Sequence, residues 1–316
     1  SEYRSVCGAM IPSQHAFWMV FSFVFGALWG SFLNVVIFRL PAGLSVIRPG
    51  SRCSSCMTPI PWYLNVPILS WLVLRGRCHA CGARFSVRYP LIEAAMGLMA
   101  VSLWLKFATP NALGTPPVTA ILVAWAFFFI FVALLISISL IDLDTMLIPD
   151  ILSVYPIPLG ICAAWLCSDI TGVSVVDSVL GMLLGGGTLL VVTYGYFALT
   201  GREGMGLGDY RLMALVGAFL GWRSLLFMLL ASALQGLLFA IVTYYSPFKR
   251  DLPDPDGLPP ELAAPEQLDS ATRKLHADEL ATFAIPFGPF IALSAIEWLT
   301  FEPWLMSFFR QYIFAP

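Results

Sequence analysis

Long apolar runs recur along this chain and constrain its fold more than any other feature. Of the 316 residues, 59% are hydrophobic and only 11% are charged, whereas soluble domains carry about 25% charged residues. A helix needs roughly 20 apolar residues to cross a bilayer, and several runs reach that length without the alternation typical of strands. We therefore predict an all-α polytopic membrane protein, because a helix satisfies its own backbone hydrogen bonds in lipid.

Eight apolar runs predict about eight transmembrane helices. They cover residues 16–39, 91–108, 118–141, 150–168, 176–199, 209–221, 224–245 and 284–300. The run at 209–221 is short for a full crossing, so a re-entrant segment is the alternative there. The predicted units are a first transmembrane helix (1–39), a small polar domain (40–90) and a transmembrane domain (91–316).

The connection between the first two runs is strongly basic. From residue 39 to residue 89 it carries seven arginines and no acidic residue. Arginine-rich connections of this length are typical of the cytoplasmic side. The third run then returns to the cytoplasmic face and ends at Asp142. Two more crossings separate Asp142 from Asp209, so we expect both acids at the same face.

Asp142 and Asp209 stand at the ends of apolar runs, where a carboxylate is costly to hold. Asp142 lies in ISLIDLDTMLIPD, and Asp209 follows three glycines in GMGLGD. Two carboxyls on one face can share a proton and activate water, as in aspartic peptidases. Each acid alone also has a structural interpretation, as a helix-end acid or as the cap of a glycine-rich turn. Their pairing favours a catalytic role for both.

Helix dipoles distinguish the two acids. Asp142 lies at a helix C-terminus, which disfavours ionisation, whereas Asp209 opens a helix, where free N–H groups favour it. We therefore predict that Asp209 takes a proton from water and that Asp142 protonates the substrate carbonyl. Two further acids lie in the same short segment as Asp142. Asp150 is expected to cap the start of a helix. Asp144 is expected either to be a solvated loop acid or to support Asp142.

Four cysteines in the basic segment form a C-x2-C-x21-C-x2-C pattern. They are Cys53, Cys56, Cys78 and Cys81. Two such pairs supply four thiolates in a tetrahedron, which suits zinc. Redox chemistry is an alternative, although the βαβ surroundings of a thioredoxin-like motif are missing, and unliganded thiols are another. We predict a zinc-ribbon-like cytoplasmic domain in which zinc is structural.

The segment 246–283 differs from the rest of the chain. It holds six prolines and eight acidic residues, a composition that predicts a flexible solvated loop. Docking of a partner to this loop is the alternative. No nucleic-acid binding is expected, because the arginines of the chain are not interleaved with exposed aromatic residues along a soluble face.

Six segments together resemble the bacterial type IV prepilin peptidases. They are GSFLNVVIFRLP (30–41), SRCSSC (51–56), GRCHACGARFSVRYPLIE (76–93), IDLDTMLIPD, GMGLGDYRLMALVGA and PFGPF (286–290). The resemblance implies an enzyme of the bacterial inner membrane, with its active site on the cytoplasmic side. Such an enzyme cleaves the leader of type IV prepilins or type II secretion pseudopilins, then N-methylates the new N-terminus with S-adenosylmethionine. The long acidic segment before PFGPF departs from the family pattern.

Carried over by motif, the resemblance makes Asp142 and Asp209 catalytic and the four cysteines metal ligands. The residues do not locate the S-adenosylmethionine site, although Glu93 is a candidate polar group near the cysteines. Gly181 and the glycines at 185–187 are expected either to pack against a neighbouring helix or to admit the apolar helix of the substrate.

Two other functions are alternatives. A presenilin-like intramembrane aspartic protease shares a G-x-G-D motif, but it pairs this acid with one deep inside another helix. A proton-coupled transporter would keep its acids near the bilayer midplane. In this chain both acids are expected at helix ends, which favours the peptidase.

Overall fold

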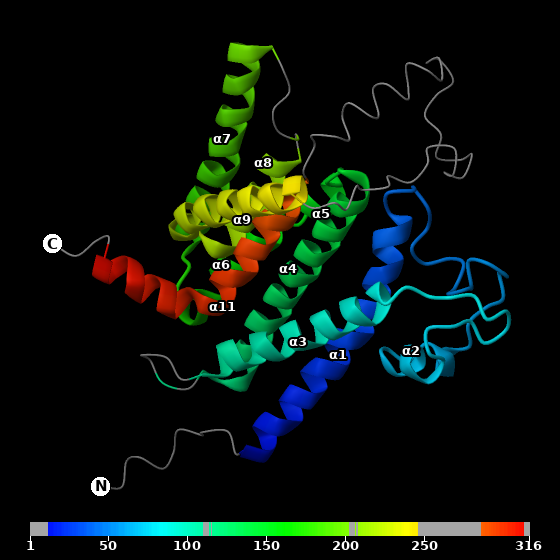
Figure 1. The fold of residues 1–316 in the computed structure, drawn as a ribbon. Coiled ribbons are helices and arrows are strands. Elements are labelled where there is room, and N and C mark those ends of the chain that lie inside the picture. Colours follow the sequence, from blue (N-terminus) through cyan, green and yellow to red (C-terminus); the bar gives the residue numbers. More distant parts are fainter. Residues whose placement is uncertain are drawn as a thin grey trace, which may run out of the picture.

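The protein is described here from a computed structural model that covers residues 12–109, 114, 116–201, 206, 208–245 and 286–312. Within these ranges the ordered structure is helical, and pairing between extended segments is limited to two isolated bridges. The helices pack around a central one, α4, while the segment that carries α2 lies to one side (Figure 1). The acidic segment predicted at 246–283 lies outside the described residues.

The helices lie where the apolar runs predict them. In chain order the elements are α1 (Pro12–Arg39), η1 (Trp62–Leu64), α2 (Leu69–Val73), α3 (Arg88–Ala108), α4 (Val118–Thr145), α5 (Asp150–Ser153), α6 (Ile157–Thr171), α7 (Val175–Thr200), α8 (Asp209–Leu220), η2 (Trp222–Ser224), α9 (Leu225–Tyr245) and α11 (Gly288–Tyr312). The run at 150–168 holds two helices, because Pro156 has no N–H to continue the first.

The prediction of an all-α polytopic membrane protein is confirmed, with a smaller number of spans. By length and composition, six helical stretches of the described chain can cross a membrane. The twelve residues of α8 are too few for a crossing. In α11, Glu297 and Glu302 interrupt the apolar sequence, which explains why it does not meet the composition of a span. The predicted eight helices are therefore present, but only six have the character of spans.

Buried aromatic side chains hold α4 against α8. Phe131 of α4 stacks on Phe219 of α8, with ring centroids 4.4 Å apart and planes 14° from parallel. Phe128 meets the same ring edge-on at 5.9 Å. Such aromatic pairs contribute about 0.5–1.5 kcal/mol beyond their burial. The contact fixes the short helix α8 against the most buried span of the protein.

Glycines bring α7 and α8 into direct backbone contact. A Cβ atom built on Gly181 would overlap the carbonyl oxygen of Gly217, and one on Gly217 would overlap that of Gly181. Gly185 and Gly186 likewise face α8, at Met213 and Ala214. These contacts support the packing interpretation for three of the four glycines predicted to admit either a neighbouring helix or a substrate. Gly187 faces open space.

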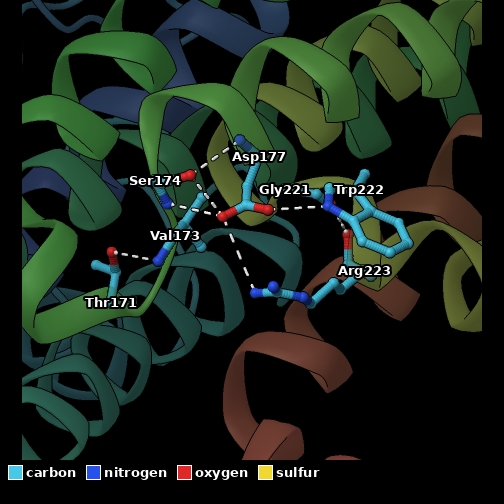
Figure 2. Close-up of polar contacts among 8 residues, drawn as sticks. Thr171, Val173, Ser174, Asp177, Gly221, Trp222 and Arg223 are labelled. Carbon is cyan, nitrogen blue, oxygen red and sulfur yellow. Dashed lines mark hydrogen bonds and ion pairs between the residues drawn. The ribbon is translucent and has the colours of Figure 1, made fainter.

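Polar contacts tie the start of α7 to the end of α8 (Figure 2). Ser174 and Asp177 form a capping box, in which each side chain accepts from the other's backbone N–H at 3.1 Å. The indole N–H of Trp222 donates to Oδ1 of Asp177 at 2.8 Å. The guanidinium of Arg223 lies 3.9 Å from Oδ2, the oxygen that belongs to the capping box. One carboxylate therefore joins the cap of α7 to the turn that follows α8.

The glycine contact makes a specific prediction about stability. Gly181→Ala places a methyl group against the backbone of Gly217 and forces α7 and α8 apart, which costs about 1–3 kcal/mol. We expect a thermal unfolding midpoint several degrees below that of the unaltered protein in the same detergent. Gly187→Ala is the matched control, because the same methyl group enters open space on the same helix. Equal midpoints for the two variants would contradict the packing described here.

Candidate active site

Asp142 and Asp209 meet where two helix ends converge. Asp142 lies in the last turn of α4, and Asp209 is the first residue of α8. Each side chain is only 5% exposed, and the two carboxyls are close enough to interact electrostatically. The structure thus brings together the two acids predicted as a catalytic pair. Their proximity disfavours two simultaneous negative charges.

A third helix end reaches the same place. The backbone N–H of Gly288, the first residue of α11, donates a buried hydrogen bond of 3.0 Å to Oδ2 of Asp142. The partly positive end of α11 is therefore directed at Asp142. The sequence prediction of acid and base roles considered only α4 and α8. The structure adds a helix that opposes the effect of the α4 C-terminus.

Ile148 and two glycines close the gap between these segments. A Cβ on Gly208 would lie 2.6 Å from Cβ of Ile148, so the turn before α8 packs directly on this side chain. A Cβ on Gly288 would lie 2.7 Å from Oδ2 of Asp142 and 3.2 Å from Cδ1 of Ile148. Only glycine fits at both positions without displacing a neighbour. Sequence reasoning assigned no role to Gly288 or Ile148, although PFGPF and IDLDTMLIPD contain them.

The flanking acids have arginine partners. Arg88 of α3 lies 2.8 Å from Asp144 and also donates to the carbonyl oxygen of Leu140 at 3.2 Å. Arg211 of α8 pairs with Asp150. Asp150 was predicted to cap a helix, but Pro149 occupies the cap position and the Asp150 carboxylate binds α8 instead. Asp144 is largely solvated, and its ion pair with Arg88 joins α3 to α4.

Asp142 and Asp209 differ from these neighbours. Across the described part of the chain, no lysine or arginine forms an ion pair with either of them. They are also far more buried than Asp144 and Asp150, whose side chains are 45% and 54% exposed. A buried carboxyl pair without a compensating cation is the arrangement that shares a proton. The geometry therefore separates the two candidate catalytic acids from the two structural ones.

The four predicted metal ligands converge in the segment between α1 and α3. Their Sγ atoms all lie within 4.8 Å of one another, with Cys53 and Cys81 at 3.8 Å and Cys56 and Cys78 at 4.0 Å. Zinc with Zn–S bonds of about 2.3 Å requires sulfur separations of about 3.8 Å in a tetrahedron. The donor set and its spacing therefore fit zinc, and zinc binding stays a prediction.

Two similar turns present these thiols. The N–H of Cys53 donates to the carbonyl of Thr58 at 3.0 Å, and the N–H of Cys78 donates to that of Ala83 at 2.8 Å. Each turn thus folds back on itself five residues later. A hydrogen bond with the Thr58 hydroxyl lowers the pKa of Cys56 to about 6, which favours the thiolate that a metal requires.

Glu93 is buried near the start of α3, beside the segment that carries the cysteines. Its Oε2 accepts a 2.7 Å hydrogen bond from the N–H of Ile68, just before α2. On its other side, Gly30 of α1 packs so closely that a Cβ there would lie 2.7 Å from Cα of Glu93. This side chain therefore ties the cysteine segment to the α1 and α3 pair.

Comparisons with known proteins agree over most of the chain. Residues 24–107 match the family model of the bacterial peptidase A24 N-terminal domain, and residues 128–241 match that of the type IV leader peptidase family. A prepilin leader peptidase/N-methyltransferase of Myxococcus xanthus is 34% identical, over 90% of this chain and 91% of the relative. No solved structure shows significant similarity.

Two further relatives carry the same name. The protein of Aeromonas hydrophila is 37% identical over 71% of this chain and 81% of its own length. That of Pseudomonas putida is 32% identical over 91% of this chain and 93% of its own length. The residues matched by the two family models include the cysteine segment and both aspartates.

The cysteine cluster predicts a measurable metal content. We expect about one zinc ion per chain in the purified protein, measured by inductively coupled plasma mass spectrometry, because four thiolates fill a structural zinc shell. Cys53→Ser should remove this zinc, since it deletes a ligand whose side chain is fully buried. Cys162→Ser, at an exposed cysteine of α6, should retain it. Full zinc content in Cys53→Ser would exclude the predicted site.

Proposed function

The chain belongs to the type IV leader peptidase family, and from this premise we propose that it is a membrane aspartic endopeptidase and N-methyltransferase. It cleaves the leader of type IV prepilins or type II secretion pseudopilins and then methylates the new N-terminus. The single observation that carries the peptidase activity is the buried meeting of Asp142 and Asp209 at helix ends, without a cation partner among the described residues.

The peptidase step follows from one proton shared by two carboxyls. The ionised carboxyl removes a proton from water, and the resulting oxygen nucleophile attacks the scissile carbonyl carbon. The protonated carboxyl donates its proton to the carbonyl oxygen. When the tetrahedral intermediate collapses, the C–N bond breaks and the leaving nitrogen takes the proton that the first carboxyl removed from water. The second carboxyl recovers a proton from a hydroxyl of the intermediate as the new carboxyl group forms. Each carboxyl thus acts once as acid and once as base.

Helix N-termini support this chemistry. Asp209 lies in the first turn of α8, and Asp142 accepts from the first N–H of α11. Both helices direct partial positive charge at the pair, where the single negative charge resides throughout the step. Among the described residues no lysine or arginine pairs with either acid, and such a cation would favour ionisation of both carboxyls.

The location of the pair suits a prepilin. Such a substrate has a basic leader followed by an apolar helix, so its scissile bond lies at the boundary of the membrane. The arginine-rich segment from residue 39 to residue 89 favours a cytoplasmic position for that end of the bundle. We therefore assign cleavage to the cytoplasmic face of the bacterial inner membrane, with the lipid bilayer surrounding the exposed apolar faces of the helices.

We infer the methyltransferase activity from the names of the relatives, which are prepilin leader peptidase/N-methyltransferases. S-adenosylmethionine is the methyl donor we propose, and it supplies an electrophilic methyl carbon to the new α-amino group. The four cysteines would hold a structural zinc ion that keeps the segment between α1 and α3 folded. Zinc takes no part in the peptidase step.

Neither alternative function is favoured. Asp142 lies in the last turn of α4, not deep within a span as a presenilin-like protease or a proton-coupled transporter would require. The match of residues 24–107 to a peptidase N-terminal domain also has no place in either alternative.

Replacement of either aspartate tests the peptidase. Asp142→Asn and Asp209→Asn should each lower kcat/KM for leader removal by roughly 10³-fold or more, because an amide cannot exchange the proton. Leader removal is measured by the mobility shift of a purified prepilin. Asp144→Asn is the control, since it neutralises an exposed acid two residues from Asp142. Cleavage at the normal rate by Asp142→Asn would refute the assignment.

Gly288 tests the position of the Asp142 carboxylate. Gly288→Ala places a methyl group 2.7 Å from Oδ2 of Asp142, and displacement of a catalytic group by about 1 Å costs roughly 10²-fold in rate. We expect kcat for leader removal to fall by this order, with KM and the thermal midpoint little changed. Gly195→Ala, at a position of α7 where a Cβ would meet nothing within 4 Å, should retain full activity. An unchanged kcat in Gly288→Ala would show that α11 does not position the acid.

A further inference from the structure

A cavity of about 590 Å³ lies apart from the two aspartates. Its walls come from the C-terminal half of α1, the first turns of α3 and the segment that carries α2, on the right in Figure 1. Sites for small molecules typically measure about 300–1,000 Å³. The peptidase chemistry makes no use of this space, so its lining indicates what else the protein binds.

Aromatic side chains line the cavity, and one of them is held in a fixed position. Trp71, Phe85 and Tyr89 all border the cavity. The indole N–H of Trp71 donates to the carbonyl of Phe85 at 3.4 Å, and Gly76, with a φ of +64°, packs against the indole ring, where a Cβ would lie 2.9 Å away. The ring is therefore held in place from two sides. A fixed aromatic surface suits the flat heterocycle of a nucleoside.

Arginines supply the positive charge of the cavity. Arg39, Arg48, Arg52 and Arg77 line it, and the surrounding segment from 39 to 89 contains no acid. Arg39 donates to the carbonyls of Ser45 and Pro49. Among the residues that the structure describes, no carboxylate pairs with the other three. Guanidinium groups that have no carboxylate partner within the protein are suited to bind the carboxylate of a ligand.

Glu93 supplies the negative charge. Among the described residues that line the cavity it is the one acidic side chain, and it is 7% exposed. Its hydrogen bond to the Ile68 N–H fixes the carboxylate, and no lysine or arginine of the described chain neutralises it. The hydroxyl of Ser70, also in the lining, is buried without a hydrogen-bond partner in the described residues. A buried carboxylate and several arginines in one lining are suited to a ligand that carries both charges.

We propose that this cavity is the binding site for S-adenosylmethionine. Glu93 provides the negative charge for its sulfonium, Arg48 and its arginine neighbours provide the positive charge for its carboxylate, and the aromatic wall accepts its adenine. Cys78 and His79 form part of the same lining, so the cysteine cluster shapes the site without contributing to the peptidase. The inference rests on the proposed methyltransferase function and adds the place where the donor binds.

The charge on sulfur provides the test. S-adenosylmethionine carries a sulfonium, whereas S-adenosylhomocysteine has a neutral thioether and the same adenosine and carboxylate. Binding of both to the purified full-length protein is measured by isothermal titration calorimetry, without prepilin. Glu93→Gln should weaken S-adenosylmethionine roughly 10- to 100-fold, the effect of losing one charged contact, and S-adenosylhomocysteine less than about threefold. Arg48→Ala should weaken both ligands to a similar extent.

Two matched variants complete the design. Glu297→Gln changes a partly buried glutamate of α11 that binds Gln235, and Arg84→Ala removes an arginine of the cysteine segment outside the lining. Both should bind the two ligands as the unaltered protein does. Equal losses of both ligands in Glu93→Gln would overturn the sulfonium assignment, and unchanged binding in both Glu93→Gln and Arg48→Ala would overturn the site. No binding by the unaltered protein would instead contradict the methyl donor of the proposed function.

Discussion

The backbone contact between Gly181 and Gly217 is the constraint on which the active site depends. The helix α8 has twelve residues and cannot cross a membrane alone, so its position is set by its neighbours. On one side the two glycines allow α7 to approach it at backbone distance. On the other, Phe219 stacks on Phe131 of α4. Because Asp209 is the first residue of α8, the depth and direction of this carboxyl follow from how α8 is held by α7, by α6, whose Gly160 packs on Ala218, and by the aromatic contact with α4.

Three helix ends then determine how the buried carboxyls are tolerated. The C-terminus of α4 carries Asp142 and adds partial negative charge, whereas the N-termini of α8 and α11 add partial positive charge. Two positive helix ends face one shared negative charge, which offsets part of the cost of burying it. The N–H of Gly288 reaches Asp142 because glycine leaves room at the start of α11. The same packing through Ile148 joins all three ends, so the site requires residues far apart in sequence to arrive together.

The sequence carried the residues of the site but not the contacts that arrange them. Asp142, Asp209 and the cysteines could be selected as candidates, because a carboxylate in an apolar run and a pair of Cys-x-x-Cys turns are both unusual without a function. The prediction of acid and base roles omitted α11, since Gly288 lies 146 positions from Asp142 and no local pattern predicts that α11 begins beside it. Among the described residues the candidate spans are six rather than about eight, for a related reason. An apolar composition indicates that a helix such as α8 is buried, but it does not say whether protein or lipid surrounds the helix. The length of α8, twelve residues, shows that it does not cross the membrane.

The placement of the cavity explains how one chain can carry out two reactions in sequence. Arg88, in the first turn of α3, pairs with Asp144, two residues beyond Asp142, and Glu93 follows Arg88 by little more than one turn of the same helix. The peptidase pair and the cavity are thus joined through α3 at one end of the bundle. Cleavage creates a new α-amino group beside the aspartates, and that group has only to move along α3 to meet a methyl donor. Arginines suit the cavity and would be harmful at the aspartates, because a cation there would keep both carboxyls ionised. The aspartates are absent from the cavity lining, and the cavity arginines form no ion pair with them, so each site has its own charge environment.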